Sequence, residues 1–434
     1  MSDNGPVRTS RRPRVAIVGA TGAVGRELLH ILAQRNLEID LVKLLASERS
    51  AGEVIHFAGR ALTVTPLEQA HFRDVDLAFF SAGSSVSRVH APRAARDGAL
   101  VIDNTNAFRA DHDVPLVVPQ VNPASLEKRP LSGLIANPNC STIPIVRLLA
   151  PIGREFGLDQ VIASTYQAAS GAGLTGIAEL FQSSREVIDG DRSESIANRF
   201  PVPLGFNVVP WIDSVMENGF TVEEQKMLHE SRKILGLPTL KVSATCVRVP
   251  VVNCHSAAVY VRCRRPVEID ALRGLWHQAP DVVVYDPQTF PSPRLIAKSD
   301  EVHVARIRRD DLDPRAFWFW VVSDNVRVGA ALNAVQIAER VIATPTFDLI
   351  NSLRRHDGWC PCRSGPEVRR IVLRHAGAGP TRRTFSARSG GGYGTRGTYR
   401  LGRQCPVRFD GTAPRLPHRH RGTASSSTGN SSGP

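Results

Sequence analysis

A cysteine stands at a junction in the chain where a thiol could be reactive. Cys140 lies in the stretch Asn137-Pro138-Asn139-Cys140-Ser141-Thr142, between a strand-like run over residues 131–136 and a helical pattern that begins at Ser141. At a helix N-terminus, unpaired backbone N–H groups and the helix dipole lower the pKa of a thiol from about 8.5. The same N–H groups would hold the oxyanion of a substrate that the thiolate attacks. The position predicts a nucleophile, although many free cysteines are only small buried hydrophobic residues.

The second half of the chain contains the other groups that such a nucleophile needs, which are a base and binding groups for charged substrates. His255 follows one predicted strand, and Arg248 ends the strand before it. Glu223 and Lys226 share a predicted helix that opens at Thr221. Because Arg248 and His255 flank a strand–turn–strand, we expect them to face one cavity. Each residue alone is more often structural, but together with the thiol they favour a catalytic site.

The N-terminal part of the chain predicts a binding site for a dinucleotide. A short apolar strand over residues 14–18 leads into Gly19-Ala-Thr-Gly22-Ala-Val-Gly25, and an amphipathic helix follows from about residue 24 to 35. Glycines allow the backbone to approach a pyrophosphate, and the helix N-terminus attracts it. The spacing is G-x-x-G-x-x-G rather than G-x-G-x-x-G, so the prediction depends on its strand–turn–helix context. The alternative is a purely structural turn.

The second predicted strand, over residues 40–46, bears on the choice of cofactor. It ends in Ser47-Glu48-Arg49-Ser50. An acid near this point binds the ribose 2′-hydroxyl of NAD, whereas a cation accommodates the 2′-phosphate of NADP. Arg49 and Ser50 therefore favour NADP, while Glu48 leaves NAD open. A solvated loop is the alternative for each residue singly.

Two further turns follow apolar strands in this half. Ser81-Ala82-Gly83 comes after the strand predicted at residues 77–80, and Asp103-Asn104-Thr105 comes after residues 100–103. In an open α/β sheet, ligands bind beyond the carboxyl ends of strands, so both turns are candidate cofactor contacts. Arg109, just past the second turn, could bind an anion, although it could equally be a surface arginine.

The fold class that these patterns predict is α/β. A Rossmann-type NADP-binding domain is expected over residues 13–139, and an α+β catalytic and dimerisation domain over residues 140–328. The second domain would contain strands near residues 160–167, 242–249, 256–261, 302–308 and 317–322, with helices near 174–187, 221–235 and 269–279. A long helix that opens at Gly329 is expected to return to the first domain, which residues 329–345 would complete.

The remaining residues, 354–434, differ in composition from the rest. They hold sixteen arginines, no lysine and three acidic residues, which accounts for the whole formal net charge of +13. Such a segment, poor in aliphatic side chains, predicts a disordered Arg/Gly/Ser-rich tail. Nucleic-acid binding through this tail is its functional alternative. The rest of the chain is formally neutral and gives no reason to expect a polyanionic partner.

Cysteine usage and hydropathy bear on location. The seven cysteines are an odd number without a framework spacing, which favours a reducing compartment. Cys360-Pro361-Cys362 is too closely spaced for a usual zinc site, so no metal is expected. The sequence contains neither an apolar run long enough to cross a membrane nor a signal-peptide core. We expect a cytoplasmic protein.

Eight motifs, in order along about residues 13–345, resemble those of the aspartate-semialdehyde dehydrogenase family. They are Gly19–Gly25, Ala46-Ser-Glu-Arg-Ser50, Phe80-Ser-Ala-Gly83, Ile102-Asp-Asn-Thr-Asn-Ala-Phe-Arg109, Asn137–Thr142, Ser164-Thr-Tyr-Gln-Ala-Ala-Ser-Gly-Ala-Gly173, Arg248-Val-Pro-Val251 with His255-Ser256, and Asp324-Asn325. The resemblance implies reversible NADPH-dependent conversion of 4-phospho-L-aspartate to L-aspartate 4-semialdehyde and phosphate. It also implies a homodimer that serves the biosynthesis of lysine, methionine, threonine and diaminopimelate.

The resemblance further implies roles for individual residues. Cys140 would be the nucleophile that forms an acyl-thioester, and His255 the acid/base. Gln167 would orient the substrate, Glu223 would meet its α-ammonium group, and Arg248 would bind its α-carboxylate in a two-pronged geometry that lysine lacks.

Two more groups of residues take roles from the family. Arg109 and Lys226 would hold the phosphate. The residues expected to contact the cofactor are Gly19, Thr21, Gly22, Ala23, Val24, Gly25, Arg49, Ser50, Ser81, Gly83, Ser170, Gly171 and Asn325.

The sequence departs from the family pattern at several points. Cys254 stands before His255 where glycine is expected, Ser84 replaces a second glycine after Gly83, and Gln120 stands where glutamate is usual. The tail has no counterpart in the family. A related activity on N-acetyl-glutamyl phosphate is the alternative enzyme reaction, but Glu223 argues against it because an acetylated amine needs no carboxylate. Membrane and nucleic-acid partners are not expected.

Overall fold

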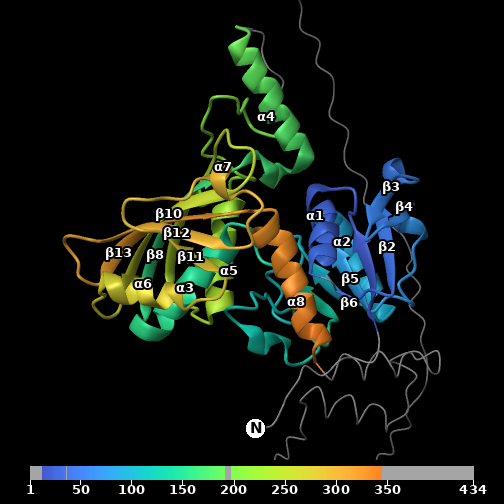
Figure 1. Cartoon of the computed structure of the whole chain (residues 1–434), viewed down its shortest axis with the longest axis horizontal. Coiled ribbons are helices and arrows are strands. Elements are labelled where there is room, and N and C mark those ends of the chain that lie inside the picture. Colours follow the sequence, from blue (N-terminus) through green and yellow to red (C-terminus); the bar gives the residue numbers. More distant parts are fainter. Residues whose placement is uncertain (1–11, 36, 191–196, 345–434) are drawn as a thin grey trace, which may run out of the picture. The chain divides into compact units, whose positions relative to one another are not determined.

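The chain between Arg12 and Thr344 contains two sheets, each covered by helices on at least one face. The computed structural model describes residues 12–35, 37–190 and 197–344. Figure 1 shows the strands of the N-terminal sheet in blue and those of the second sheet from green to orange. The tail predicted over residues 354–434 lies outside the described residues.

The first sheet has seven strands in the order β3-β4-β2-β1-β5-β6-β7. From β1 the chain proceeds to β2 on one side and to β5 on the other, and both neighbours pair with β1 in parallel. Such a reversal of strand order creates a crevice at the carboxyl end of the central strand. The strands are β1 (Arg14–Val18), β2 (Leu41–Ala46), β3 (Val54–Phe57), β4 (Arg60–Pro66), β5 (Leu77–Phe80), β6 (Leu100–Asp103) and β7 (Leu134–Ala136).

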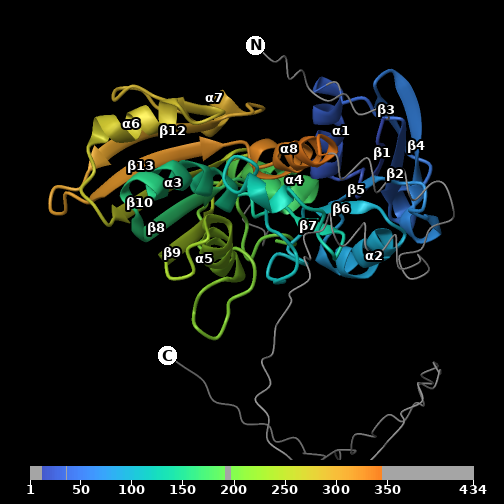
Figure 2. The same ribbon diagram turned by 90° about the horizontal axis from the view of Figure 1, so that it is seen from below.

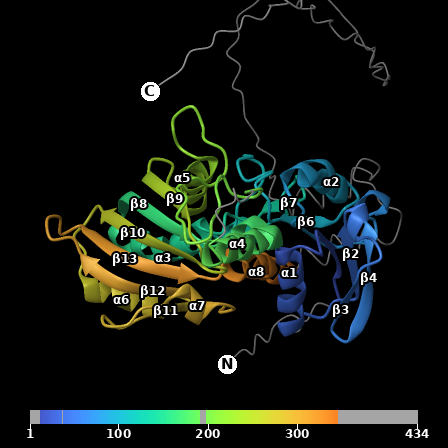
Figure 3. The ribbon, with the colours of Figure 1, turned by 90° about the horizontal axis from the view of Figure 1, so that it is seen from above.

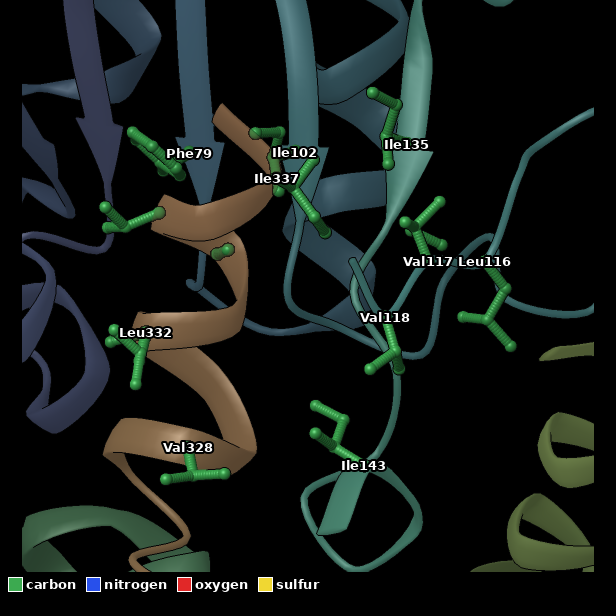
Figure 4. Packing of buried hydrophobic residues seen from close by; sticks show 14 of the residues in the cluster. Phe79, Ile102, Leu116, Val117, Val118, Ile135, Ile143, Val328, Leu332 and Ile337 are labelled. Carbon is green, nitrogen blue, oxygen red and sulfur yellow. The ribbon is translucent and has the colours of Figure 1, made fainter. Parts of the chain in front are cut away.

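Helices from both ends of the chain cover this sheet. Helices α1 (Ala23–Gln34) and α2 (Ser84–Arg96) follow β1 and β5, and α8 (Leu332–Ile342) returns from the end of the described chain. Figure 4 shows Leu332 and Ile337 of α8 beside Phe79 and Ile102 of the sheet. Because both faces are covered, β1 and β5 are almost wholly buried and apolar, as parallel strands usually are.

The second sheet has six strands in the order β11-β12-β13-β10-β8-β9, with antiparallel and parallel pairs mixed. The strands are β8 (Leu158–Gln167), β9 (Lys241–Arg248), β10 (His255–Cys263), β11 (Val282–Val284), β12 (Val302–Arg309) and β13 (Ala316–Ser323). Helices α3 (Thr142–Phe156), α5 (Val222–Leu235) and α6 (Ile269–His277) run along this sheet (Figure 2). Trp276 of α6 is fully buried against Phe317 and Phe319 of β13.

The other face of the second sheet carries large side chains that remain accessible. Along β8 the odd-numbered residues from Val161 to Thr165 are buried, whereas Ile162 and Tyr166 are exposed. On the same face, the ring of Tyr166 packs on that of Trp320, and the ring of Tyr260 packs on that of Trp318. Exposed aromatic and apolar side chains on one sheet face are typical of an association surface.

Helix α4 (Gly173–Ile188) extends away from both sheets. It packs near α1, as Figures 1 and 3 show from two directions. Leu180 is buried with Phe200 and Leu204, but Phe181 and Ile188 remain half or more exposed. This helix therefore adds to the accessible apolar surface.

The structure differs from the sequence-based expectations at the connection into α8. An α-helix was predicted to begin at Gly329. The chain instead forms one wider turn there, a π-helix over Arg327–Ala331, and the α-helix begins only at Leu332. Two short elements, β11 and α7 (Pro293–Ile296), were not predicted. No helix in the described part of the chain is long and apolar enough to cross a membrane.

Candidate active site

The cysteine loop connects β7 to α3, and Asn139 gives it its shape. The side-chain oxygen of Asn139 accepts a hydrogen bond from the backbone N–H of Ser141 at 2.8 Å, and its backbone oxygen accepts one from Thr142 at 3.0 Å. Its amide nitrogen donates to Glu223 at 3.0 Å. Asn139 therefore holds Cys140 at the start of α3 and ties the loop to α5.

The electrostatic environment of Cys140 contradicts the expectation of an acidified thiol. Burial, and next the negative charge of Glu223, raise the pKa of Cys140 to about 11. The cations Arg109, Arg248 and Lys226 act in the opposite direction but do not outweigh them. The N-terminus of α3 lowers the pKa of the thiol less than burial raises it. A helix N-terminus stabilises a nearby negative charge by about 1 kcal/mol, whereas burial can shift a pKa by several units. This environment favours the thiol over the thiolate.

His255 opens β10 with its ring in a defined orientation. The backbone N–H of Ala168 donates to His255 Nδ1 at 3.0 Å. His255 Nε2 is buried and has no hydrogen-bond partner among the described residues. Burial, and then the charge of Arg248, place the pKa of His255 well below its ordinary 6.5. The imidazole is therefore neutral at neutral pH, with its proton on Nε2.

The backbone conformation of Cys254, the residue before His255, accounts for the glycine that the family pattern leads us to expect there. Cys254 has a φ of 71°, in the left-handed region where glycine is favoured and a Cβ is disfavoured. Its side chain is fully buried and packs with Ile296 and Val322. The sulfur contacts offset part of the backbone strain, which is how a cysteine is accommodated at this position.

Helix α5 presents the groups expected to meet the substrate. It begins with a capping box in which Thr221 and Glu224 exchange hydrogen bonds, so Glu223 lies in the first turn. Glu223 is buried and accepts hydrogen bonds from Gln167 at 3.1 Å and from Lys226 at 3.2 Å. Lys226, in turn, pairs with Asp213 at 2.8 Å. Burial acts to raise the pKa of Glu223, but the positive charge of Lys226 and the hydrogen bonds from Asn139, Gln167 and Lys226 outweigh it, so the pKa is lowered and the carboxylate is charged.

Arg248 ends β9 beside His255. Its Nη1 donates to the backbone oxygen of Ala168 at 2.7 Å, and its guanidinium lies 5.8 Å from the ring centroid of Phe200. A Cβ placed on Gly171 would lie 2.8 Å from Arg248 Nη1 and 3.3 Å from His255 Nε2. The structure thus brings Arg248 and His255 together at the backbone of Gly171.

Arg109 approaches the cysteine loop from the first sheet. Its guanidinium donates to the backbone oxygens of Asn104 and Asn137, both at 2.9 Å, and to Glu230 at 3.0 Å. Three of its five N–H groups are used in this way, so two remain for a ligand. Arg109 is a fixed group of the site rather than a mobile surface residue.

Sequence reasoning missed Glu230. This fully buried glutamate accepts hydrogen bonds from the backbone N–H of Asn139 at 2.6 Å and from Arg109. A signal for it existed, because Glu223, Lys226 and Glu230 are spaced by three and four residues and so share one face of α5. Glu230 joins the cysteine loop to the cation expected to bind phosphate.

The glycine turn after β1 packs tightly against its own helix and the end of the neighbouring strand. A Cβ on Gly19 would lie 2.8 Å from the backbone of Ser81, and one on Gly25 would lie 2.2 Å from the backbone oxygen of Gly19. Only glycine allows this close packing of turn, helix and neighbouring strand, and it exposes the N-terminus of α1 at the switch point of the sheet. Thr21, Gly22, Ala23 and Val24 belong to this turn or to the first residues of α1, and Gly83 precedes α2 in the same way.

The end of β2 lies next to this turn. The Thr21 hydroxyl donates a hydrogen bond to the Ser50 hydroxyl at 3.4 Å. Arg49, which lies between Glu48 and Ser50, is exposed. The glycine cradle, together with an exposed cation and hydroxyl at the end of β2, fits a dinucleotide that carries a 2′-phosphate.

Ser170 and Asn325 approach the site from the second sheet. The Ser170 hydroxyl bonds to the Asn325 amide at 3.0 Å, and Asn325 Oδ1 accepts from the backbone N–H of Cys254, also at 3.0 Å. Asn325 therefore supports the backbone that leads into His255. Both expected cofactor contacts lie in one hydrogen-bonded group.

Comparison with known proteins defines the class. Residues 14–129 match the family described as semialdehyde dehydrogenase, NAD binding domain, and residues 149–328 match semialdehyde dehydrogenase, dimerisation domain. The chain thus combines the NAD binding and dimerisation domains of a semialdehyde dehydrogenase, and Cys140 lies between the two matched ranges. Residues from both halves meet at the cysteine loop.

Individual relatives narrow the class. The chain is 46% identical over 333 residues to the aspartate-semialdehyde dehydrogenase of Aquifex aeolicus, across 76% of this chain and 98% of that one. It is 45% identical over 334 residues to the Bacillus subtilis enzyme of the same name, across 75% and 96%. The chain belongs to the aspartate-semialdehyde dehydrogenase family.

Solved structures agree with this assignment. The Vibrio cholerae aspartate semialdehyde dehydrogenase II complexed with ASA superposes with a TM-score of 0.75 at 42% identity, covering 77% of this chain and 99% of that one. The Candida albicans enzyme with NADP superposes with a TM-score of 0.61 at 26% identity, covering 78% and 100%. The matched part corresponds to the two sheets described above.

Proposed function

We propose that the protein converts 4-phospho-L-aspartate, NADPH and a proton to L-aspartate 4-semialdehyde, phosphate and NADP⁺, and that it also runs the reverse reaction. The observation that carries the proposal is the set of charges around Cys140. Glu223, Lys226, Arg109 and Arg248 all act electrostatically on the thiol. A phosphorylated amino acid has two anionic groups and one cationic group, which is the complement of three cations and a carboxylate.

Cys140 Sγ would attack the acyl-phosphate carbonyl, form a thioester and release phosphate. The three surrounding cations would favour the thiolate in the complex, and the thiol proton would leave with the phosphate. The ammonium group of the substrate neutralises Glu223, which is the charge that raises the pKa of Cys140. Substrate binding would thereby help to activate the nucleophile.

His255 would then stabilise negative charge at the substrate oxygen. Because Nδ1 accepts from Ala168, Nε2 carries the proton of the neutral ring, and this N–H would donate a hydrogen bond to an oxyanion formed at the thioester carbon. The bound nicotinamide supplies a hydride. Collapse of the oxyanion, with cleavage of the C–S bond, would release the aldehyde and the Cys140 thiolate, which takes up the proton that the overall reaction consumes.

The other side chains would orient the substrate. Arg248 is held by Ala168 and retains N–H groups for the α-carboxylate, which a planar guanidinium binds through two parallel hydrogen bonds. Gln167 would orient the substrate near the thioester, and Glu223, joined to it at 3.1 Å, would meet the α-ammonium group. Arg109 and Lys226 would bind the phosphate. NADP is the proposed cofactor because Arg49 and Ser50 follow β2.

Assembly and location complete the proposal. We infer a homodimer formed through the exposed face of the second sheet, where Ile162 and Tyr166 are more than one-third accessible. The match to a dimerisation domain over residues 149–328 supports this. The cysteines of the described chain are free thiols, which fits the cytoplasm.

The test compares two aldehydes. Purified protein is given NADP⁺ and phosphate with either L-aspartate 4-semialdehyde or N-acetyl-L-glutamate 5-semialdehyde, and NADPH is followed by absorbance. We expect kcat/KM for the first to exceed that for the second by at least about 1,000-fold, because an acetylated amine carries no positive charge to pair with the buried carboxylate of Glu223. A preference for the acetylated substrate would contradict the proposal.

A further inference from the structure

The turn that connects β13 to α8 lies directly against Cys140. Residues Arg327–Ala331 form a single π-helical turn. In it the backbone N–H of Gly329 donates to Asp324 at 3.1 Å and that of Ala331 donates to Val326 at 3.0 Å, each across five residues. A π turn is wider than an α-helical turn by one residue, and such turns are rare outside functional sites. It pushes the backbone of Gly329 toward the cysteine loop.

Gly329 has no room for a side chain. A Cβ at this position would lie 2.7 Å from Cys140 Cβ, 3.0 Å from its Cα and 3.1 Å from its backbone oxygen. Carbon atoms pack at about 3.5–4.0 Å, so one of the two segments would have to move by roughly 1 Å. The obstructing atoms belong to the backbone and first side-chain carbon of Cys140, so no rotation of a flexible side chain relieves the contact.

The turn is anchored both to the cysteine loop and to the core. Asn333 donates to Asn137 Oδ1 at 2.6 Å and to the backbone oxygen of Val117 at 3.0 Å, and Asn137 donates to Ala330 at 3.3 Å. Val328 and Leu332 are buried in the main hydrophobic core, as Figure 4 shows. A side chain at position 329 would therefore press directly on Cys140.

Arg327 and Asp324 also hold the π turn in place. Arg327 is buried and pairs with Asp300, while it also bonds to Glu27 and Gln34 of α1. Asp324 accepts hydrogen bonds from the backbone N–H groups of Val326 and Arg327 at 2.9 and 3.0 Å. These contacts leave the turn little freedom to retreat from the cysteine loop.

We propose that Gly329 is a positioning residue for the nucleophile: the π turn forms a backstop whose missing side chain sets where Cys140 Sγ lies relative to His255 Nε2 and the substrate carbonyl. The inference rests on the proposed role of Cys140. A displacement of about 1 Å at a reacting group lowers a rate by about 100-fold. Gly329 would thus act on the chemical step through the position of Cys140.

A matched glycine is available as a control. Gly274 lies within α6, and a Cβ there would meet nothing within 4 Å. Gly274→Ala adds the same methyl group in open space and improves helix propensity by about 1 kcal/mol. Comparison with this control separates the general effect of adding a methyl group from the specific effect of adding one next to Cys140.

The experiment compares wild type, Gly329→Ala, Gly274→Ala and Cys140→Ser as purified full-length proteins. Phosphate-dependent NADPH formation gives kcat, fluorescence titration gives the NADP Kd, and mass spectrometry gives the rate at which iodoacetamide alkylates Cys140. For Gly329→Ala we expect kcat to fall by about 100-fold and the alkylation rate to change by at least about tenfold, with the NADP Kd within about threefold of wild type. Gly274→Ala should match wild type in all three measurements.

The outcomes separate the two proposals. Inactive wild type would refute the proposed function itself. Active wild type, inactive Cys140→Ser and a Gly329→Ala enzyme with unchanged kcat and alkylation rate would overturn the positioning role alone. If Gly329→Ala does not fold, Asn333→Ala releases the same turn from Asn137; we then expect kcat to fall by at least about tenfold at unchanged NADP Kd. Unchanged kcat in folded Asn333→Ala would equally overturn the inference.

Discussion

The backbone N–H of Ala168 donates a hydrogen bond to His255 Nδ1 at 3.0 Å. A backbone amide is always a donor, so Nδ1 has to be the unprotonated nitrogen and Nε2 carries the proton of the neutral ring. The same residue accepts from Arg248 through its backbone oxygen at 2.7 Å. Ala168 therefore fixes both His255 and the expected carboxylate-binding group of the site, through its backbone alone.

The pKa of His255 predicts a pH dependence of stability. Its folded-state pKa lies well below 6.5, because of burial and the charge of Arg248. The unfolded chain binds a proton near pH 6.5 and the folded chain does not, so this contribution is complete above that pH and is lost as the pH falls below it. The free energy of unfolding, measured with urea, should fall between pH 7.5 and pH 5.5. We expect this decrease to be about 1 kcal/mol smaller in His255→Gln than in wild type. Equal losses would contradict the assignment.

Glu223 should have opposite effects on thiol reactivity and on catalysis. Its charge raises the pKa of Cys140, so Glu223→Gln should increase the rate of Cys140 alkylation at pH 8 by at least about threefold. The same change removes the expected partner of the substrate ammonium group, so kcat/KM should fall by at least about 100-fold. Glu127→Gln, at an exposed position, is the control and should change neither. Slower alkylation in Glu223→Gln would refute this account of the thiol.

Glu230 predicts a defect in phosphate use. Glu230→Gln weakens the support of Arg109 and of the Asn139 N–H, which face it at 3.0 and 2.6 Å. We expect KM for phosphate to rise by about tenfold and stability to fall by about 1–3 kcal/mol, since a buried charged hydrogen bond is lost. Steady-state kinetics with varied phosphate and urea unfolding measure the two effects. The account fails if KM rises for the aldehyde but not for phosphate.

Arg49 should set the preference between cofactors. Arg49→Ala removes the exposed cation at the end of β2, so KM for NADP⁺ should rise by at least about tenfold while KM for NAD⁺ stays within about threefold. Arg60→Ala, an exposed arginine on β4, serves as the matched control. A parallel rise in both KM values for Arg49→Ala would show that the side chain does not read the 2′-phosphate.

The exposed face of the second sheet should form the dimer. Ile162→Asp places a charge among apolar and aromatic side chains on this face, and we expect sedimentation to give half the wild-type mass at micromolar protein. Val54→Asp adds the same charge at an exposed apolar position on β3 of the other sheet and should leave the mass unchanged. An unchanged mass for Ile162→Asp would place the dimer contact elsewhere.

Sequence patterns were sufficient for most elements and for most of the side chains that lie together near the cysteine loop, although not for Glu230. Strands such as β1 and β8 carry clear periodicities, and the glycine turn has a backbone requirement visible in the sequence. The thiol pKa was predicted wrongly, because desolvation and Glu223 depend on a fold that brings α5 to the cysteine loop. The tail over residues 354–434 stays a prediction.

Two features could not be found from periodicity. The π turn adds one residue to a turn whose sequence reads as ordinary helix, so the role of Gly329 depends on a contact with a residue nearly two hundred positions away. From the sequence, Cys254 is only a departure from an expected glycine. The structure shows that its backbone is left-handed, which is why glycine is expected, and that its side chain packs against Ile296. Both depend on tertiary contacts rather than local pattern.

The central claim is that Cys140 carries the acyl group between phosphate and hydride chemistry. Its most direct test is NADPH formation from L-aspartate 4-semialdehyde and NADP⁺, with and without phosphate, by wild type and by Cys140→Ser. The account predicts phosphate-dependent NADPH formation by wild type and a loss of at least about 1,000-fold in Cys140→Ser, because a serine hydroxyl lacks an accessible anion. Comparable phosphate-dependent rates in the two proteins would contradict it.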